Sequence, residues 1–164
     1  MKYKPIVMIS LGVLLFFSIP SHGAQILRIS AIPDEAPSDL IRKFKPLEKY
    51  LEKELDMKVK FIPLVNYAAT VEALSAGKVD LVWYGGFTHV QARLRTRGGA
   101  RPLVMRIRDA RFKSKFIARK GSGIKTLRDL KGKTFAFGSV SSTSGHLMPR
   151  FFLKIDGKVV EKKC

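Results

Sequence analysis

The fold is decided by residues 66–84, which read NYAATVEALSAGKVDLVWY. Asn66 is a residue type that caps helices, and apolar side chains then recur at helical spacing until Gly77, where a helix is expected to end. The residues that follow, 79–84, are apolar except for Asp80 and predict a strand directly after that helix. A short helix that leads at once into a strand is typical of an α/β fold.

Strand and helix patterns alternate on both sides of this unit. Ser38 is expected to cap a helix with one apolar stripe, and Pro46 is expected to divide that helix because its ring blocks an interior hydrogen bond. Further strands are predicted at 26–32, 59–63, 102–105, 115–119 and 134–137, and further helices at 88–97, 126–132 and from His146 onward. The alternation predicts an α/β fold with a largely parallel sheet and right-handed crossovers.

Composition narrows the classes of protein that the chain can belong to. The 164 residues suffice for one domain or parts of two, and 46% of them are hydrophobic, which is enough for a core. The single cysteine, Cys164, excludes an intramolecular disulfide framework and a cysteine-based zinc site. No metal-ligand cluster is recognisable, so neither a metal nor a cofactor is expected.

The N-terminal segment, residues 1–23, has the pattern of a signal peptide. Two lysines precede an apolar run over 6–19, which is short for a membrane span, and Gly23 fits the position before a cleavage site. Cleavage one residue later and an uncleaved membrane anchor are the alternatives. We therefore expect a periplasmic protein that has no stable membrane insertion after cleavage.

The chain is strongly basic. Its 31 Lys and Arg against 13 Asp and Glu give a net charge of +18, of which +16 remains once Lys2 and Lys4 are removed with the signal. Residues 93–120 hold 11 basic residues and one acid, Asp109. These charges can draw anions towards a cleft, or they can form a solvated basic face. An exported chain has little access to chromosomal DNA or RNA, so no nucleic-acid partner is expected.

Ligands of α/β proteins bind beyond the carboxyl ends of the strands. After the sixth predicted strand, hydroxyl side chains and a glycine lead into a helix, and a helix start presents unpaired amides and a partial positive charge to an anion. Tyr67 follows the second predicted strand and Tyr84 ends the third, and both can donate from their phenols. The expected ligand-binding residues are Tyr67, Tyr84, Ser142, Thr143, Ser144, Gly145 and His146.

An enzyme is the competing interpretation. One of the hydroxyls at 142–144 could act as a nucleophile with His146 or His89 as its base. No G-x-S-x-G pattern supports that interpretation, and three consecutive hydroxyl side chains suit passive binding better. No catalytic residue is therefore assigned, and the chain is not expected to be an enzyme.

Four segments resemble a known family: residues 46–55, 66–81, 122–137 and 142–145. They are similar to the periplasmic phosphate, phosphite and phosphonate (and selenate) substrate-binding proteins of ABC transporters. The resemblance implies two α/β lobes of the type II periplasmic-binding-protein kind that close on an oxyanion. It implies contacts from Tyr67 and from the hydroxyls of 142–144, with Tyr84 and His146 in the corresponding loops. The implied partners are a small oxyanion and the ABC permease subunits of the inner membrane.

Family members are roughly twice as long as this chain. We therefore expect lobe 1 to be largely present at 24–108 and lobe 2 to be incomplete at 109–164, as in a C-terminally truncated copy with a frameshifted tail from Lys154 to Cys164. The expected function is that of a solute-binding component for a tetrahedral oxyanion such as phosphonate, phosphite, phosphate or selenate. The alternatives are a non-functional fragment and a periplasmic serine-dependent hydrolase.

Overall fold

Three strands form one parallel sheet in the computed structural model, which describes residues 25–155. The strands are β1 (Ile26–Ala31), β2 (Lys58–Phe61) and β3 (Leu81–Trp83), in the order β2-β1-β3. Ile29 of the central strand lies opposite Phe61 on one side and Leu81 on the other. The predicted parallel α/β arrangement is confirmed.

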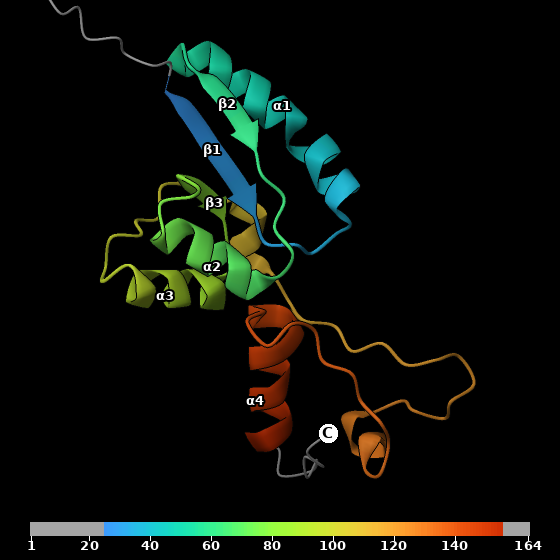
Figure 1. Cartoon of the computed structure of the whole chain (residues 1–164). Coiled ribbons are helices and arrows are strands. Elements are labelled where there is room, and N and C mark those ends of the chain that lie inside the picture. Colours follow the sequence, from blue (N-terminus) through green and yellow to red (C-terminus); the bar gives the residue numbers. More distant parts are fainter. Residues whose placement is uncertain (1–24, 156–164) are drawn as a thin grey trace, which may run out of the picture.

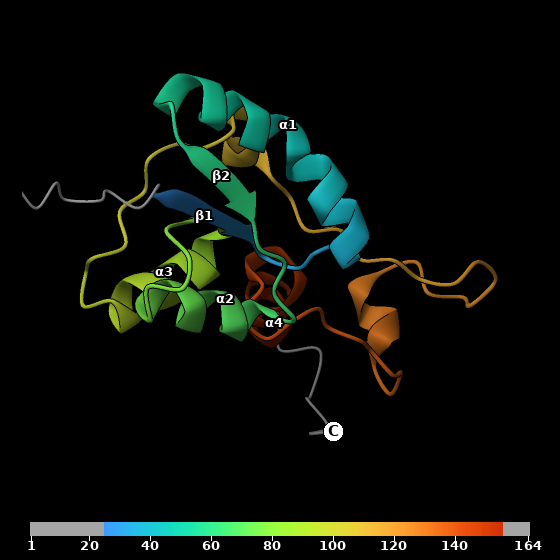
Figure 2. The ribbon, with the colours of Figure 1, turned by 45° about the horizontal axis from the view of Figure 1, so that its top comes forward.

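The helices cover both faces of this sheet. Helix α1 (Pro37–Leu55) joins β1 to β2, α2 (Tyr67–Ser75) joins β2 to β3, and α3 (Gly86–Arg95) follows β3. Because β1 is central and its two neighbours lie on opposite sides, the successive crossovers run in opposite directions. Helix α1 accordingly lies on one face of the sheet and α2 and α3 on the other (Figures 1 and 2).

The main core lies between α1 and the sheet. Leu40 of α1 and Ile29 of β1 are almost fully buried, and the rings of Phe44 and Phe61 stack with centroids 4.8 Å apart. The apolar stripe predicted for this helix faces the core, as expected. Burying a side chain of this size stabilises the fold by about 1.5–3 kcal/mol, so this layer supplies much of the stability of the sheet.

Two carboxylates of α1 bind backbone amides of β2. The Glu48 side chain is buried and accepts a hydrogen bond of 2.6 Å from the amide of Phe61, and Glu52 accepts one of 3.2 Å from the amide of Val59. Lys45 lies 3.1 Å from the second oxygen of Glu48. These contacts satisfy strand donors that β1 does not reach.

An ion pair joins β1 to the start of β3. The Arg28 guanidinium donates to both carboxylate oxygens of Asp80, at 2.9 and 2.7 Å, and the Arg28 amide donates to the same carboxylate at 2.8 Å. These hydrogen bonds hold the pKa of Asp80 below its ordinary value against the opposing effect of partial burial.

Helix α1 differs from the sequence-based prediction in two respects. It begins after Ala36, with Pro37 in its first turn, so Ser38 is not its cap. It also continues through Pro46 without a division. Proline is well tolerated at the first helical position, and the interior Pro46 persists because the apolar residues on both sides of it pack on the sheet.

Beyond α3 the chain has little regular structure until η3 (Thr143–Leu147) and α4 (Met148–Ile155); in between lie the short helices η1 (Ile107–Arg111) and η2 (Leu127–Leu130). The capping box predicted at Thr126 and Asp129 is present. The strands predicted at 102–105, 115–119 and 134–137 are not formed. A strand is stabilised by hydrogen bonds to a neighbouring strand, and these segments have no such neighbour among residues 25–155.

The predicted signal peptide, residues 1–23, lies outside the described residues, as does nearly all of the expected tail from Lys154. Within residues 25–155, no helix is both long enough and apolar enough to cross a membrane.

Candidate anion-binding site

Three helix starts lie close together beyond the carboxyl ends of the strands. Helix α2 begins after Asn66, whose side chain accepts from the Ala69 amide at 2.8 Å, which confirms the predicted cap. Helix α3 begins after Gly85, and η3 begins after Ser142. Unpaired amides and the helix dipole give such starts a positive potential, so this is the edge of the sheet where an anion is favoured.

Tyr67 and Ser142 connect two of these helix starts. Burial raises the pKa of the half-buried Tyr67 phenol above its ordinary value, a side-chain hydrogen bond with Ser142 opposes that rise, and the negative charge of Asp34 adds to it. The phenol is therefore protonated at neutral pH. A protonated phenol beside a serine hydroxyl can donate a hydrogen bond to an oxyanion.

Thr143 connects η3 to the start of α3. Its Oγ1 accepts a hydrogen bond of 2.7 Å from the amide of Phe87, and it lies 3.6 Å from where a Cβ would stand at Gly85 or Gly86. A Cβ at either glycine would make an ordinary van der Waals contact with this oxygen. A threonine hydroxyl that accepts from an amide keeps its own proton for donation, so Thr143 can also serve an anion.

The backbone amides of this loop are less available than the sequence suggested. The Gly145 amide donates to the Ser142 hydroxyl at 3.1 Å, and the His146 amide donates to the Ser142 carbonyl at 3.2 Å. The sequence predicted unpaired amides at this helix start and included Gly145 and His146 among the ligand-binding residues. In this structure the amides of Gly145 and His146 serve the cap and the helical turn instead.

The remaining predicted residues of the loop mainly shape it. The Ser144 carbonyl accepts from the Ser114 hydroxyl at 2.8 Å, and the Gly145 carbonyl accepts from the Gly138 amide at 2.8 Å. The His146 ring lies 4.8 Å from the ring of Phe137, and its Nδ1 is buried with no hydrogen-bond partner among residues 25–155. These contacts hold η3 against the segment that precedes it.

Tyr84 makes a contact within the fold. Its phenol donates to the carbonyl of Thr70 in α2 at 2.7 Å, and burial raises its pKa to about 12. Its hydroxyl proton is therefore engaged within the fold. The structure brings Tyr67 together with Ser142 and Thr143, whereas Tyr84 fastens β3 to α2.

Sequence reasoning missed a second contact between α3 and the loop. The Thr88 side chain is fully buried and its hydroxyl donates to the Ser141 carbonyl at 2.8 Å. Ser114 and Asp34 were also missed, although each interacts with a predicted site residue. The sequence feature that could have indicated this contact is Thr88, a polar residue on the helix face that packs inward.

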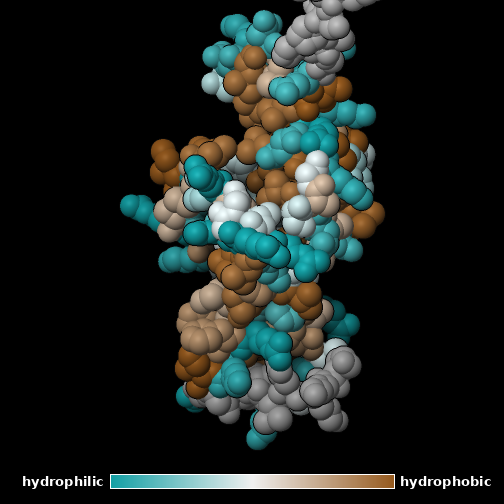
Figure 3. All heavy atoms as spheres, turned by 60° about the vertical axis from the view of Figure 1, so that its left-hand side comes forward, coloured by the Kyte–Doolittle hydropathy of each residue, from teal (hydrophilic) through white to brown (hydrophobic). Residues whose placement is uncertain are grey.

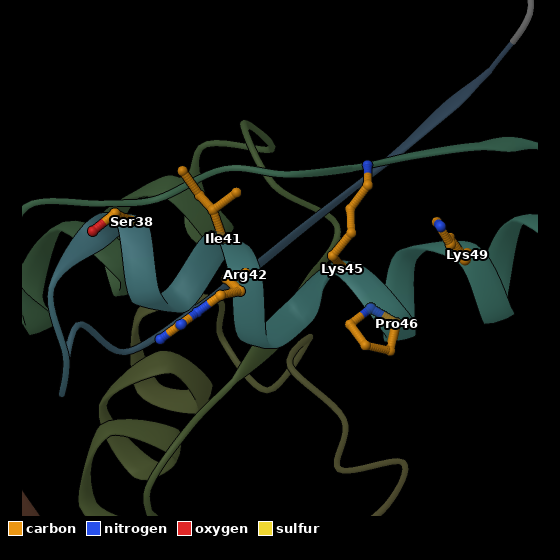
Figure 4. Close-up of a pocket in the computed structure, with 6 residues that line it drawn as sticks. All are labelled: Ser38, Ile41, Arg42, Lys45, Pro46 and Lys49. Atoms are coloured by element: carbon orange, nitrogen blue, oxygen red, sulfur yellow. The ribbon is translucent and has the colours of Figure 1, made fainter.

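Two hollows on the surface lie away from these residues. An open groove of about 630 Å³ runs along the outside of α1, and its lining includes Arg42, Lys45 and Lys49 (Figure 4). A second hollow, of about 440 Å³, lies between α2 and α3 and includes Gln91 and Ser141. Neither is lined by a predicted ligand residue. Hydrogen-bond geometry, rather than a ready-made cavity, therefore defines the candidate site.

Residues 25–155 contain no group of three or more His, Cys, Asp or Glu side chains placed to hold a metal ion. Within the same range, no hydrogen bond joins a histidine to a hydroxyl of residues 142–144. The nucleophile and base of the hydrolase interpretation are therefore not paired.

A parallel sheet with helix starts and hydroxyl donors gathered at one edge is the arrangement in which α/β proteins favour an anion. The family described as "ABC transporter, phosphonate, periplasmic substrate-binding protein" matches residues 29–164. The chain belongs to this family, which confirms the resemblance inferred from the sequence.

Curated relatives point to the same family. The probable ABC transporter phosphite binding protein PhnD1 of Prochlorococcus marinus (strain MIT 9301) is 41% identical over 87% of this chain and 51% of its own length. The phosphate-import protein PhnD of Mycolicibacterium smegmatis is 38% identical over 81% of this chain and 43% of its own length. The chain thus spans about half the length of these relatives.

Solved structures support the fold. The structure of PhnD1 from Prochlorococcus marinus in complex with methylphosphonate is similar, with a TM-score of 0.63 and 34% identity over 80% of this chain and 50% of that one. A binding protein component of an ABC phosphonate transporter from Pseudomonas aeruginosa has a TM-score of 0.68 at 23% identity, over 82% of this chain and 46% of its own, and shows the fold alone. The type II periplasmic-binding-protein class is thereby confirmed, with a first lobe largely present and a second incomplete.

Proposed function

We propose that this chain supplies part of the solute-binding component of an ABC importer, and that it takes part in binding a tetrahedral oxyanion of the phosphonate, phosphite or phosphate kind. One observation supports the proposal: at the start of η3, Ser142 interacts with Tyr67 of α2 and Thr143 accepts from the Phe87 amide of α3, so three helix starts converge there. Selenate, which has the same tetrahedral shape, belongs to the same ligand class.

The donors favour a binding function over an enzymatic one. Phenol and hydroxyl groups are neutral, and together with the helix starts they can bind a desolvated anion without a cationic side chain. The methylphosphonate bound to the Prochlorococcus relative is a ligand of this size and charge. We extend the proposal to export by residues 1–23, to a periplasmic location and to ABC permease subunits as the receiving partner.

We also propose the division of the mature chain into lobe 1, residues 24–108, and part of lobe 2, residues 109–164. The sheet and the helices α1 to α3 fall in the first range, and η3 and α4 in the second. The hydrogen bonds from Phe87 to Thr143 and from Thr88 to Ser141 cross between the two ranges. The candidate site therefore lies where the proposed lobes meet.

The experiment is isothermal titration calorimetry of the purified chain against methylphosphonate, phosphite, phosphate, selenate and sulfate. We expect the chain to bind at least one phosphorus oxyanion. Tyr67→Phe and Ser142→Ala should each lower the affinity by roughly tenfold or more, because each removes a hydrogen bond to a charged group. Tyr50→Phe is the matched control, since Tyr50 is an exposed tyrosine of α1.

Two outcomes separate the proposal from its alternatives. Heat from none of the five anions, in a folded and monodisperse sample, would contradict the proposed ligand class. Anion binding that disappears at moderate salt, and that the Tyr67 and Ser142 variants leave unchanged, would instead indicate the basic surface as the binding element. A desolvated site depends much less on ionic strength.

A further inference from the structure

The loop that joins β1 to α1 passes the edge of the sheet where the candidate anion site lies. The Ile32 amide donates to the Trp83 carbonyl at 3.1 Å, so this loop starts beside the end of β3. A Cβ at Gly85 would stand 3.9 Å from Ile32 Cδ1, so the loop also lies against the start of α3. In Figures 1 and 2 the loop leaves β1 at the edge where α2 and η3 begin.

This position is a topological switch point of the sheet. Strands β1 and β3 are neighbours, and the helices that follow them, α1 and α3, lie on opposite faces. The chain therefore turns away in opposite directions after the two strands, which is the place where α/β proteins bind their ligands. A charged side chain in the loop after β1 acts on a ligand that is bound there.

Asp34 is a carboxylate of this loop that has no cation of its own. Its amide donates to the Ile32 carbonyl at 2.9 Å, which keeps the residue close to the end of β1. The next residue, Glu35, forms an ion pair with Lys43. Among residues 25–155, neither a hydrogen bond nor an ion pair reaches the Asp34 side chain. Asp34 therefore brings an unneutralised negative charge to a place where helix starts favour an anion.

The charge of Asp34 reaches the candidate donors. It contributes to the raised pKa of the Tyr67 phenol, and Tyr67 interacts in turn with Ser142. An oxyanion bound by these two hydroxyls thus lies in the field of a carboxylate. Two negative charges at one binding site repel each other, whereas an ionised carboxylate is a strong acceptor for an O–H group of the ligand.

The net charge of the chain does not distinguish one anion from another. Its 31 Lys and Arg residues attract every anion. On the face seen in Figure 3, hydrophilic side chains are spread over the upper, middle and lower parts of the molecule. Selection among anions therefore depends on groups at the site itself, and Asp34 is a charged side chain placed to exert it.

We propose that Asp34 determines specificity at the candidate site by favouring oxyanions that carry a proton over fully ionised ones. Phosphate, phosphite and methylphosphonate retain an O–H group in part of their population at neutral pH, and that group can donate to the Asp34 carboxylate. Sulfate and selenate have no such proton at neutral pH, so Asp34 only repels them. Binding sites achieve specificity in this way by placing a repulsive element against the wrong ligand. The inference rests on the proposed function and narrows its ligand class.

The test compares phosphite with sulfate by isothermal titration calorimetry at neutral pH and constant ionic strength. We expect the parent chain to prefer phosphite, and Asp34→Asn to reduce the ratio of the two affinities by about threefold or more, mainly through tighter binding of sulfate. Asparagine has nearly the shape of aspartate, and Asp34 is exposed, so the variant should fold. Glu35→Gln is the matched control, because it removes the same charge from the neighbouring, ion-paired residue and should leave the ratio unchanged.

A second measurement tests the position of Asp34 without any anion. Asp34 raises the pKa of the Tyr67 phenol, so Asp34→Asn should lower the pH at which that phenol ionises. Glu35→Gln should change it less. Ultraviolet absorbance follows the ionisation, and Tyr67→Phe identifies the step that belongs to Tyr67.

The outcomes separate this inference from the proposed function. If the parent chain binds phosphite and Asp34→Asn leaves the ratio of affinities unchanged, the proposed function stands and the specificity role of Asp34 is overturned. An equal fall of the ratio in Glu35→Gln would attribute the preference to net charge and would overturn that role as well. An unshifted Tyr67 ionisation in Asp34→Asn would remove Asp34 from the site. If the parent chain binds no oxyanion, the proposed ligand class and the specificity role fall together.

Discussion

The Thr143 hydroxyl oxygen accepts a hydrogen bond of 2.7 Å from the backbone amide of Phe87. The two residues are 56 positions apart in the sequence. This bond fixes the start of η3 against the start of α3, and Thr88 reinforces it through the Ser141 carbonyl. The position of the candidate anion donors thus depends on a few polar contacts between distant segments.

Thr143→Val should weaken both the fold and anion binding. The substitution leaves the partly buried Phe87 amide without an acceptor, which costs about 1–3 kcal/mol of unfolding free energy. Urea denaturation and calorimetric titration measure the two effects. Thr143→Ser retains the hydroxyl and should restore both; a valine variant that binds an anion like the parent chain would exclude this hydroxyl from the site.

Tyr84→Phe should lower stability without affecting anion affinity. The variant loses the hydrogen bond to the Thr70 carbonyl, at a cost of about 0.5–1.5 kcal/mol. In the folded parent chain, one tyrosine should ionise only near pH 12, as monitored by ultraviolet absorbance, and that high-pH step should disappear in the variant. A fall in anion affinity that matches Tyr67→Phe would place Tyr84 in the site after all.

Glu48→Ala should destabilise the sheet. The buried carboxylate accepts from the Phe61 amide, and hydrogen bonds to charged groups contribute about 1.5–3 kcal/mol. Chemical denaturation measures the loss. Glu54→Ala, at an exposed position of the same helix, is the matched control and should change little. Equal effects of the two substitutions would show that helix propensity, rather than the contact with β2, determines the result.

Asp80→Asn should flatten the dependence of stability on acid pH. Arg28 lowers the pKa of Asp80, so the pair stabilises the fold fully above the pKa of an unfolded Asp and loses its contribution as pH falls through the lower folded pKa. Unfolding free energies at pH 7 and at about pH 3 should differ less in the variant than in the parent.

Some acid dependence should remain in the Asp80 variant, because hydrogen bonds from the amides of Lys125 and Thr126 also lower the pKa of Asp129. Both side chains of the Arg28–Asp80 pair are 37% exposed, so added salt should reduce the difference between variant and parent. Identical pH profiles at low salt would rule out a contribution of this pair to stability.

Gly138→Ala should displace η3. A Cβ at this position would stand 3.2 Å from the Gly145 Cα and 3.4 Å from its carbonyl carbon, and backbone atoms cannot rotate away. We expect a loss of about 1–3 kcal/mol, as for overpacked cores, together with weaker anion binding. The stability control is Gly86→Ala, whose Cβ would meet Thr143 Oγ1 at an ordinary 3.6 Å. If thermal denaturation shows no difference between the two variants, the close approach of the glycines is unimportant.

The first half of the fold could be predicted because each element carries its own signal. Asn66 caps α2, and the apolar stripe of α1 packs on the sheet, as the spacing indicated. The strands expected at 102–105, 115–119 and 134–137 could not be predicted correctly from pattern alone. Strand formation depends on a neighbouring backbone, and the local sequence does not reveal whether one is present.

The site was predictable in its residue types and less so in its hydrogen bonds. Hydroxyls before a helix indicated an anion cradle, and the structure brings Ser142 and Thr143 beside Tyr67 and α3. The engagement of the Gly145 amide by the Ser142 cap could not be read from the sequence, because it depends on the π-helical turn. The tie between Tyr84 and Thr70 depends likewise on how α2 packs beside β3.

The carboxylates of Glu48 and Glu52 protect the β2 edge of the sheet. They accept from the amides of Phe61 and Val59, so a further strand arriving on that side would find these two donors of β2 already taken. The opposite margin, along β3, has no strand beside it among residues 25–155. Addition of a strand along β2 is therefore disfavoured, because the carboxylates of α1 already satisfy these two amides.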